Sequence, residues 1–188
     1  SVTGVQTCAL PICDDVVFGG GNSGSVSGES LAGGAGDDVV LGDYGRVVWS
    51  LAADRSGIVT LVESIDTSYG DDDTITGGTE SDVIVGGAGD DTIDAGSGDD
   101  MVVGDAATIV FFGVPDGFDR STAPARRLST IDTLTPSVGG ADDITAGSGD
   151  DVVVGGLAGD SITGDDGDDV LVGDYADLVF AQIGRAHV

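Results

Sequence analysis

The residues of this chain that could do chemistry are carboxylates that recur at one fixed place in a nine-residue repeat. Units in phase with one another cover residues 24–41, 68–103 and 137–172, and a truncated unit ends at Phe18. Each unit has a carboxylate at its sixth position and a large aliphatic residue at its eighth. Regularly spaced carboxylates offer the hard oxygen ligands that calcium prefers. The sixth-position residues are Asp15, Glu29, Asp38, Asp73, Asp82, Asp91, Asp100, Asp142, Asp151, Asp160 and Asp169.

Many of these carboxylates stand next to a second one, as Asp91 does beside Asp90. Two carboxylates can also hydrolyse a glycosidic bond. Similar doublets recur in nearly every unit, however, and nothing marks one of them as an active site. We therefore predict no catalytic residues, no organic cofactor and no enzyme activity.

The charge balance limits the partners of the chain. It carries 34 acidic residues against 6 lysines and arginines, a net charge of −28. Nucleic acids and anionic membranes both need a basic face, so neither is expected as a partner. No apolar run reaches about 18 residues, so no membrane span is predicted. The chain is 40% hydrophobic and has material for a core, but something must neutralise its aspartates, and a divalent cation is the economical candidate.

Both ends look foreign to the repeat. Residues 2–12 (VTGVQTCALPI) and 183–188 (IGRAHV) resemble translations of the two strands of a sequencing-library adaptor. We expect residues 1–12 to be disordered, and we exclude them and residues 183–188 from fold reasoning, which leaves a fragment of a larger protein. Cys8 and His187 are excluded with them, and the codon of Cys13 straddles the junction. No disulfide framework, zinc ligand set or Cys/His nucleophile then remains.

The repeat predicts one tight turn and one short strand per nonapeptide. Its glycine-rich first four positions allow positive φ, and positions seven to nine are short and β-branched. Side chains alternate along a strand, so the eighth points inward while its neighbours point out. Two nonapeptides then form one coil, and successive coils stack as parallel strands in two sheets.

This GGxGxDxUx pattern resembles the RTX family of secreted calcium-binding repeats. The resemblance is most faithful at residues 86–103 and 146–154. It implies an all-β, right-handed parallel β-roll that binds Ca²⁺ between turns on the same side, two repeats apart. Glu80 and Ala158 stand where the fourth glycine is expected, and Glu29 replaces an aspartate, so sites that use these turns are expected to be weak or empty.

Carried onto this sequence, the resemblance assigns metal ligands in pairs, with backbone carbonyls of the turns completing each shell. It also implies type I secretion. Because crowded aspartates repel one another without metal, we predict that the apo chain is largely disordered and that calcium folds it. The pairs are Asp73 with Asp91, Asp82 with Asp100, Asp142 with Asp160 and Asp151 with Asp169; Asp38 and Asp15 are further candidate ligands.

A longer period lies above the nonapeptide. Residues 36–49, 98–111 and 167–180 read GDDVVLGDYGRVVW, GDDMVVGDAATIVF and GDDVLVGDYADLVF. Each long repeat is therefore four nonapeptides followed by an insert, and we expect the roll to continue through the inserts. The resulting division is roll repeats at 13–41, 68–103 and 137–172, inserts at 42–67 and 104–136, and the start of a third insert at 173–182.

The first insert predicts a β-hairpin of residues 46–52 and 58–65, and the second predicts strands near 108–114 and 128–134. The inserts end alike, in SIDT (64–67) and TIDT (130–133). We expect the hairpins to pack on a face of the roll and bury their aromatic rings. The alternative is a recognition face for cell-surface or polysaccharide ligands, with Trp49, Arg126 and Arg127 as anchors. The aromatic residues concerned are Tyr44, Trp49, Phe111, Phe112, Phe118, Tyr175 and Phe180.

The leading functional hypothesis is a non-catalytic calcium-binding segment of a large secreted or cell-surface bacterial protein, such as an adhesin or exoprotein. Arrays of equal units make stalks and extended surfaces, which favours this reading. The alternative is a repeat module of a secreted enzyme or toxin (protease, lipase, epimerase or haemolysin) with its catalytic domain elsewhere. A β-helix acting directly on polysaccharide is weaker, because the repeats contain no basic residue.

Overall fold

The computed structural model describes residues 14–20, 28–51, 57–111, 128–134 and 139–180, and these form an all-β structure of three sheets. The all-β fold and the parallel roll predicted from the sequence are confirmed. None of the described residues forms a helix that could cross a membrane. The predicted disorder of residues 1–12, and the predictions for Phe112, Phe118, Arg126 and Arg127, fall outside the described residues.

The first roll sheet is parallel and takes alternate nonapeptides along the chain. Residues at the eighth position lie in register across it, with Val40 beside Ile84 and Ile84 beside Val102. The sheet continues past the second insert, because Val102 pairs in turn with Val153. Its strands, in spatial order, are β1 (Val16–Phe18), β3 (Val39–Leu41), β7 (Val83–Gly87), β9 (Met101–Asp105), β13 (Val152–Gly156) and β15 (Val170–Asp174).

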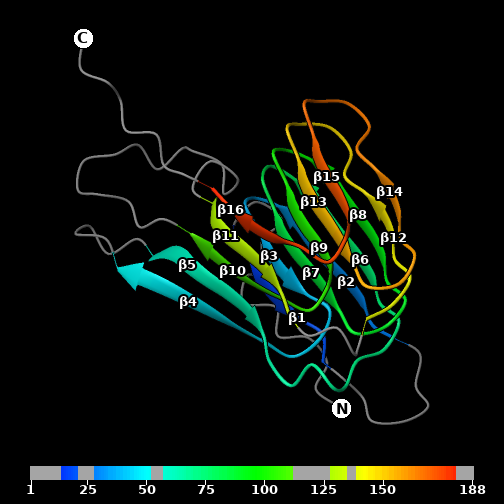
Figure 1. Ribbon diagram of the computed structural model, residues 1–188. Helices are drawn as coiled ribbons and strands as arrows, with labels where there is room; N and C mark the ends of the chain where they lie inside the picture. The colour runs from blue at the N-terminus through cyan, green and yellow to red at the C-terminus, as the bar shows by residue number, and fades with distance from the viewer. Residues whose placement is uncertain (1–13, 21–27, 52–56, 112–127, 135–138, 181–188) are drawn as a thin grey trace.

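The second roll sheet takes the other nonapeptides and is also parallel (Figure 1). The eighth-position side chains of both sheets form one buried cluster, as predicted, except at the end of the roll, where Ile162 is only partly buried and Leu171 of β15 is 45% exposed. Val40, Ile84, Val102, Ile144 and Val153 are completely buried there. The strands of this sheet, in spatial order, are β14 (Ser161–Thr163), β12 (Asp143–Thr145), β8 (Thr92–Ser97), β6 (Thr74–Thr79) and β2 (Ser30–Ala35).

The inserts build a third sheet, the insert sheet, which is antiparallel throughout. The two strands of each insert pair with each other, and β5 of the first insert pairs with β10 of the second. Successive hairpins therefore join edge to edge at the left of the roll in Figure 1. Its strands, in spatial order, are β16 (Asp177–Val179), β11 (Leu128–Thr133), β10 (Ala107–Phe111), β5 (Gly57–Ser64) and β4 (Gly45–Leu51).

The similar SIDT and TIDT motifs do not occupy equivalent places. The N–H of Ile65 donates to the carbonyl of Tyr44 (2.8 Å), and the N–H of Leu134 donates to the carbonyl of Ala106 (2.7 Å). Ile65 is therefore equivalent to Leu134, and the two motifs are three residues out of step. Equivalent residues of the two inserts are therefore defined by the backbone hydrogen bonds of the insert sheet and not by the similar sequences SIDT and TIDT.

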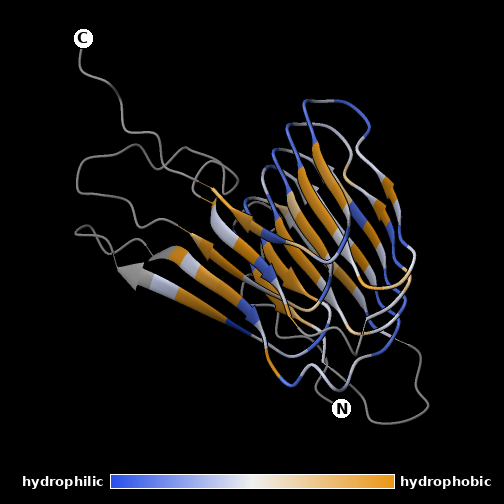
Figure 2. Cartoon of the chain, in the orientation of Figure 1, coloured by the Kyte–Doolittle hydropathy of each residue, from blue (hydrophilic) through white to orange (hydrophobic). Residues whose placement is uncertain are grey.

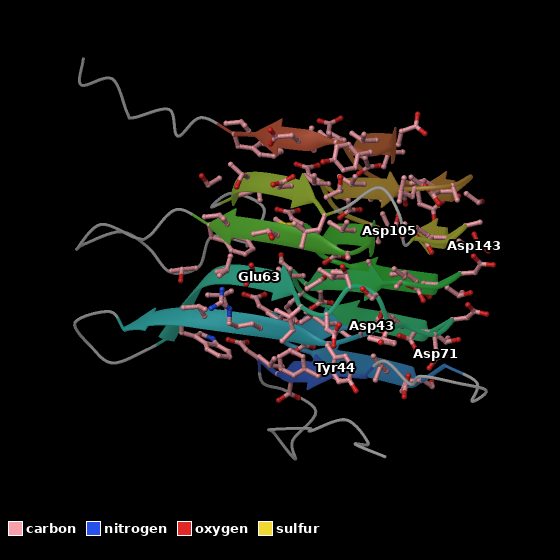
Figure 3. The ribbon with its side chains drawn as sticks, turned by 60° about the horizontal axis from the view of Figure 1, so that its bottom comes forward. Asp43, Tyr44, Glu63, Asp71, Asp105 and Asp143 are labelled. Atoms are coloured by element: carbon pink, nitrogen blue, oxygen red, sulfur yellow. The ribbon has the colours of Figure 1, made fainter. Side chains whose placement is uncertain are left out.

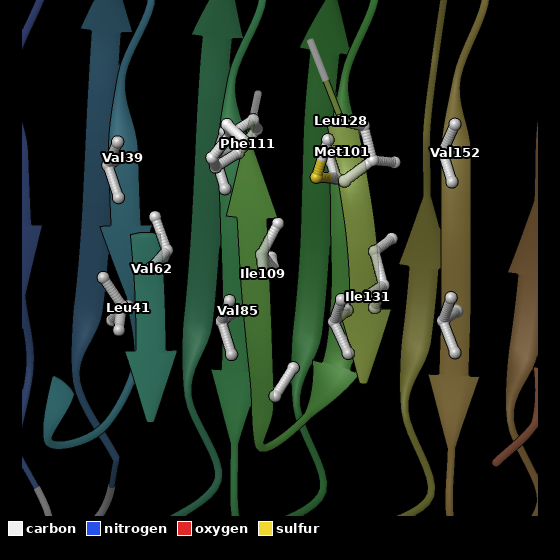
Figure 4. Packing of buried hydrophobic residues seen from close by; sticks show 14 residues of the cluster. Val39, Leu41, Val62, Val85, Met101, Ile109, Phe111, Leu128, Ile131 and Val152 are labelled. Carbon is white, nitrogen blue, oxygen red and sulfur yellow. The ribbon is translucent and has the colours of Figure 1, made fainter. Parts of the chain in front are cut away.

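The insert sheet covers the outer face of the first roll sheet. Val83 and Val85, at the seventh and ninth positions of their unit, are buried there, whereas Thr92 and Asp94, at the same positions in the second sheet, are exposed. Figure 2 shows the orange strands of this interface between bluer turns, and Figure 4 shows its side chains at close range. The buried cluster comprises Val39, Leu41, Val62, Val83, Val85, Met101, Val103, Ala107, Ile109, Phe111, Leu128, Ile131, Val152 and Val154.

The expected burial of the insert aromatics is only partly correct. Phe111 is buried, but Trp49 is 47% exposed, and Tyr44 and Tyr175 are exposed as well. Aliphatic side chains fill most of the inward positions of the insert sheet, so few rings are needed there. Trp49 follows a register shift in β4, where the pairing with β5 is irregular.

Candidate metal centre

The sixth-position carboxylates gather into two columns, one along each edge of the roll. Each coil consists of two nonapeptides with one turn each, so every coil places one sixth-position carboxylate at each edge. Each residue of the first column directly precedes a strand of the second roll sheet, and each residue of the second column directly precedes a strand of the first roll sheet. The first column is Glu29, Asp73, Asp91, Asp142 and Asp160; the second is Asp15, Asp38, Asp82, Asp100, Asp151 and Asp169.

Within a column, each carboxylate accepts a hydrogen bond from the backbone of its neighbour one coil away. The N–H of Asp73 donates to Oδ1 of Asp91 (2.8 Å), and the N–H of Asp82 donates to Oδ1 of Asp100 (2.8 Å). All four pairs assigned from the sequence adjoin in this way; the other two are Asp142 with Asp160 (3.1 Å) and Asp151 with Asp169 (3.1 Å).

The columns also run across the inserts, which the sequence pairing did not include. The N–H of Asp91 donates to Oδ1 of Asp142 (2.8 Å), although 51 residues separate them. The N–H of Asp100 donates to Oδ1 of Asp151 (2.7 Å) over the same separation. Candidate sites between coils therefore do not stop where an insert leaves the roll.

The second oxygen of these carboxylates is buried and has no hydrogen-bond partner among the described residues. A buried carboxylate oxygen without a partner is costly unless a cation or a proton satisfies it. The oxygens concerned are Oδ2 of Asp38, Asp73, Asp82, Asp91, Asp100, Asp142, Asp151 and Asp160.

The first-position glycines leave room beside these oxygens. A Cβ built on Gly77 would lie 2.6 Å from Oδ2 of Asp82 and 2.5 Å from the carbonyl oxygen of Ala95. The same point beside Gly33 would lie 2.5 Å from Oδ2 of Asp38 and 2.8 Å from the carbonyl oxygen of Gly77. A carboxylate oxygen and a carbonyl oxygen of the next coil thus converge on a place where only glycine fits.

This combination of donors suits calcium. Calcium takes six to eight oxygen ligands from carboxylates and backbone carbonyls in flexible geometry. Within the described residues, no group of three or more His, Cys, Asp or Glu side chains is arranged to hold a metal ion. Side chains alone therefore do not make the site, and turn carbonyls have to supply further ligands, as the family resemblance implies.

The electrostatics of both columns favour gain of a positive charge. Burial, reinforced by neighbouring carboxylates, raises the pKa of Asp91 to about 9 and that of Asp82 to about 8. The same cause raises the pKa of Asp142 to about 7. Arg46 is the single cationic side chain among the described residues, and it pairs with Glu63 on the insert sheet (2.5 Å). No cationic side chain in the described part of the roll neutralises the columns.

Two of the departures from the repeat keep the positive φ that the turn has at its fourth position. Glu80 and Ala158 adopt φ of 70° and 78° at the fourth position, where Gly89 has 136°. Oε2 of Glu80 accepts hydrogen bonds from Thr79 (2.6 Å) and from the N–H of Gly36 (3.0 Å). The prediction that sites at these turns are weak or empty stays a prediction.

Sequence reasoning missed two buried carboxylates, Asp43 and Asp105, that belong to neither column. Asp43 lies two residues beyond the end of β3 and Asp105 is the last residue of β9, at the point where an insert leaves the roll (Figure 3). Burial raises the pKa of Asp43 to about 7 and that of Asp105 to about 6. The signal was present in the long repeat, which reads GD at this point where other turns of this edge read GG.

A comparison with protein families bears directly on these columns. The family model of the RTX calcium-binding nonapeptide repeat (4 copies) matches residues 23–46, 67–102 and 138–171, which is half of the chain. The chain belongs to this RTX repeat family. RTX nonapeptides bind calcium ions, and every column residue except Asp15 lies within the matched ranges of this RTX chain. No curated protein and no solved structure gives a match.

The residues that fit the ion in this RTX roll are the sixth-position aspartates and the carbonyls of the turns that face them. Bound calcium would supply positive charge and an oxygen-coordinating centre between coils. In eight of these aspartates Oδ1 accepts the N–H of the neighbouring coil, and the buried Oδ2 would be the oxygen that faces the ion. An aspartate at this position can therefore supply both an acceptor for the backbone and a charged oxygen for calcium.

Proposed function

We propose that this chain is a non-catalytic, calcium-dependent structural segment of a large secreted or cell-surface bacterial protein, of the adhesin or exoprotein type, that folds on calcium outside the cell. The observation that carries the proposal is the pair of carboxylate columns, in which eight aspartates bury an Oδ2 that has no hydrogen-bond partner among the described residues. Such columns are stable only when cations or protons neutralise them.

The architecture supports a structural role. Each long repeat adds two coils to the roll and one hairpin to the insert sheet, and the roll and the insert sheet extend in the same direction. A unit that contacts only its neighbours gives an elongated body whose length follows the number of repeats. Its exposed side chains on the insert sheet, including Trp49, are the surface on which a ligand would be sought.

Calcium titration of the full chain tests the proposal. In excess chelator at neutral pH we expect the far-ultraviolet circular dichroism of a largely unfolded chain, and a β-sheet spectrum after calcium is added. Magnesium at the same concentration should restore much less signal, because it demands a tighter octahedral shell. A full β-sheet spectrum in chelator at neutral pH would contradict calcium-driven folding.

A pair of neighbouring variants tests the assignment of the columns. Asp91→Asn removes a buried column carboxylate, and Asp90→Asn removes an exposed carboxylate from the same turn. We expect Asp91→Asn to lower the number of bound calcium ions, measured by isothermal titration calorimetry, and to raise the calcium concentration needed for folding about tenfold or more, which corresponds to about 1.4 kcal/mol. Asp90→Asn should change neither by more than about twofold, and equal effects of the two variants would refute the assignment.

A further inference from the structure

Asp43 and Asp105 occupy equivalent places in successive long repeats. Each follows the first-position glycine of a turn, and each stands two residues before the first strand of an insert. They are 7% and 3% exposed, although they lie where the chain leaves the roll. Turns of the same edge that carry no insert have Gly87 and Gly156 at this position. Something at the insert junction therefore uses a buried carboxylate where the ordinary turn uses glycine.

The contacts of Asp105 show what that use is. Its Oδ1 accepts the N–H of Gly140 (3.0 Å), at the fourth position of the turn where the chain re-enters the roll. Its Oδ2 accepts the N–H of Leu157, at the third position of the next coil. One carboxylate thus holds three stretches of chain together: the exit of the insert, its return, and the coil that follows.

Asp43 repeats this arrangement one long repeat earlier. Its Oδ2 accepts the N–H of Ala88 (2.7 Å), at the third position of the next coil. The backbone of Asp71, at the fourth position of the re-entering turn, also faces this carboxylate, but Oδ1 of Asp43 makes no well-formed hydrogen bond among the described residues. The groups that face the two aspartates thus match in position, and Asp105 has one hydrogen bond more. Figure 3 shows Asp43 and Asp105 at different levels of the stack, each where the insert strands meet the roll.

The glycines opposite each carboxylate leave it the space it needs. A Cβ on Gly87 would come close to Oδ2 of Asp43, and one on Gly156 would come close to Oδ2 of Asp105. Gly70 and Gly139, in the two re-entering turns, are approached in the same way. Both junctions therefore enclose a carboxylate between glycines of the re-entering turn and of the next coil.

We propose that Asp43 and Asp105 are insert-anchoring residues, which close the roll beneath each insert through backbone hydrogen bonds and thereby hold the insert sheet on the first roll sheet. They are positioning residues and not calcium ligands. Asp174 stands at the same position of the third long repeat, where it is exposed. Along this edge of the roll, GD in place of GG then marks the point where a long insert leaves.

The test compares asparagine variants of the calcium-loaded full chain. An asparagine side chain has one acceptor oxygen and an amide group that donates, so in Asp105→Asn one of the two N–H groups loses its acceptor. We expect amide hydrogen exchange at Gly140 or Leu157 to become about tenfold faster or more, with faster exchange through β10 and β11. The number of calcium ions bound should stay that of the unaltered chain.

Asp165→Asn is the matched control. Asp165 also stands at the second position of its turn, but it is exposed, lies on the other edge of the roll, and precedes no insert. Its variant should leave exchange in the insert sheet unchanged. If Asp105→Asn does not fold even in calcium, Asp43→Asn is read instead, at Asp71 and Ala88, because Asp43 has one fewer well-formed hydrogen bond to lose.

Two outcomes would overturn the inference. One is unchanged exchange at both junctions; the other is loss of a calcium ion from either variant, which would make the residue a ligand. The inference rests on the proposed function only through the calcium count. An unaltered chain that binds no calcium contradicts the proposed function, whereas normal calcium binding with unchanged exchange in the variants contradicts the anchor alone.

Discussion

In eight of the column aspartates the two carboxylate oxygens have different environments. Oδ1 of Asp91 accepts the N–H of Asp73 and so fixes the spacing between coils, while its Oδ2 stays buried without a partner. Asparagine could keep the first contact but would present a neutral group to the second place. Glutamate would carry the charge on a longer side chain, and within the two columns it occurs only at Glu29, the first residue of its column. The residue type follows from both demands together.

The turn requires a positive φ at the fourth position of the repeat, and Ala158 adopts it at a cost in backbone strain. Its φ of 78° is in the left-handed region, where a side chain costs about 1–2 kcal/mol relative to glycine. Glycine loses more chain entropy on folding, which offsets about 0.4–1 kcal/mol. We expect Ala158→Gly to stabilise the calcium-loaded chain by up to about 1 kcal/mol in urea unfolding. A destabilised variant would show that the methyl group makes a packing contribution that outweighs the strain.

The strands of the insert sheet divide their residues cleanly between two faces. One row of residues, each paired with the next across the five strands, faces the roll: Val47, Val62, Ile109, Ile131 and Leu178. The adjacent row on the outer face, Val48, Leu61, Val110, Thr130 and Val179, is paired in the same way. Each hairpin therefore adds two rungs to both rows. The inner row is the adhesive that joins insert sheet to roll.

Neighbouring residues of β10 test which face holds the insert sheet in place. Ile109 is fully buried between the sheets and Val110 is 36% exposed on the outer face. We expect Ile109→Ala to destabilise the calcium-loaded chain by about 2–5 kcal/mol, because it leaves a cavity in close-packed surroundings. Val110→Ala should cost less than about 1 kcal/mol. Urea unfolding followed by circular dichroism measures both, and comparable losses would mean that the outer row is also covered.

At the scale of the whole molecule, the two columns make stability depend on the charge of the buried carboxylates. Without metal, the folded pKa values run from about 6 for Asp38 to about 9 for Asp91, against an ordinary value of 3.8. Between pH 3.8 and these raised pKa values, the folded metal-free chain therefore holds more protons than the unfolded chain. Its stability is greatest below about pH 4 and is lost as the pH rises through about 6 to 9.

Circular dichroism in chelator as a function of pH checks this linkage. We expect the β-sheet signal to increase as the pH is lowered from 8 towards about 4, because protons then neutralise the columns as calcium does. In saturating calcium the signal should change little over the same range. Calcium binding at neutral pH should release protons, which calorimetry in buffers of different ionisation enthalpy detects. A chelated chain that is equally unfolded at both ends of the range would show that protons cannot replace the ion.

The nonapeptide by itself determined the roll, because each unit encodes its own turn, strand and inward side chain within nine residues. It also determined which carboxylates stack: residues such as Asp73 and Asp91 lie 18 positions apart, and one coil takes 18 residues. These are local relations, and a regular chain propagates them from unit to unit. The place of the inserts on the chain was readable for the same reason, since the repeat is interrupted there.

Only the tertiary structure decided where the inserts go and what closes the roll beneath them. Contacts of Asp105 with Gly140 and Leu157 span 35 and 52 residues, and no local rule relates these positions. The apolar seventh and ninth positions of alternate units, such as Val83 and Val85, signal a covered face, but they do not say what covers it. That answer depends on how strands of different inserts pair, which is fixed by the coil-to-coil spacing that the two aspartate columns maintain.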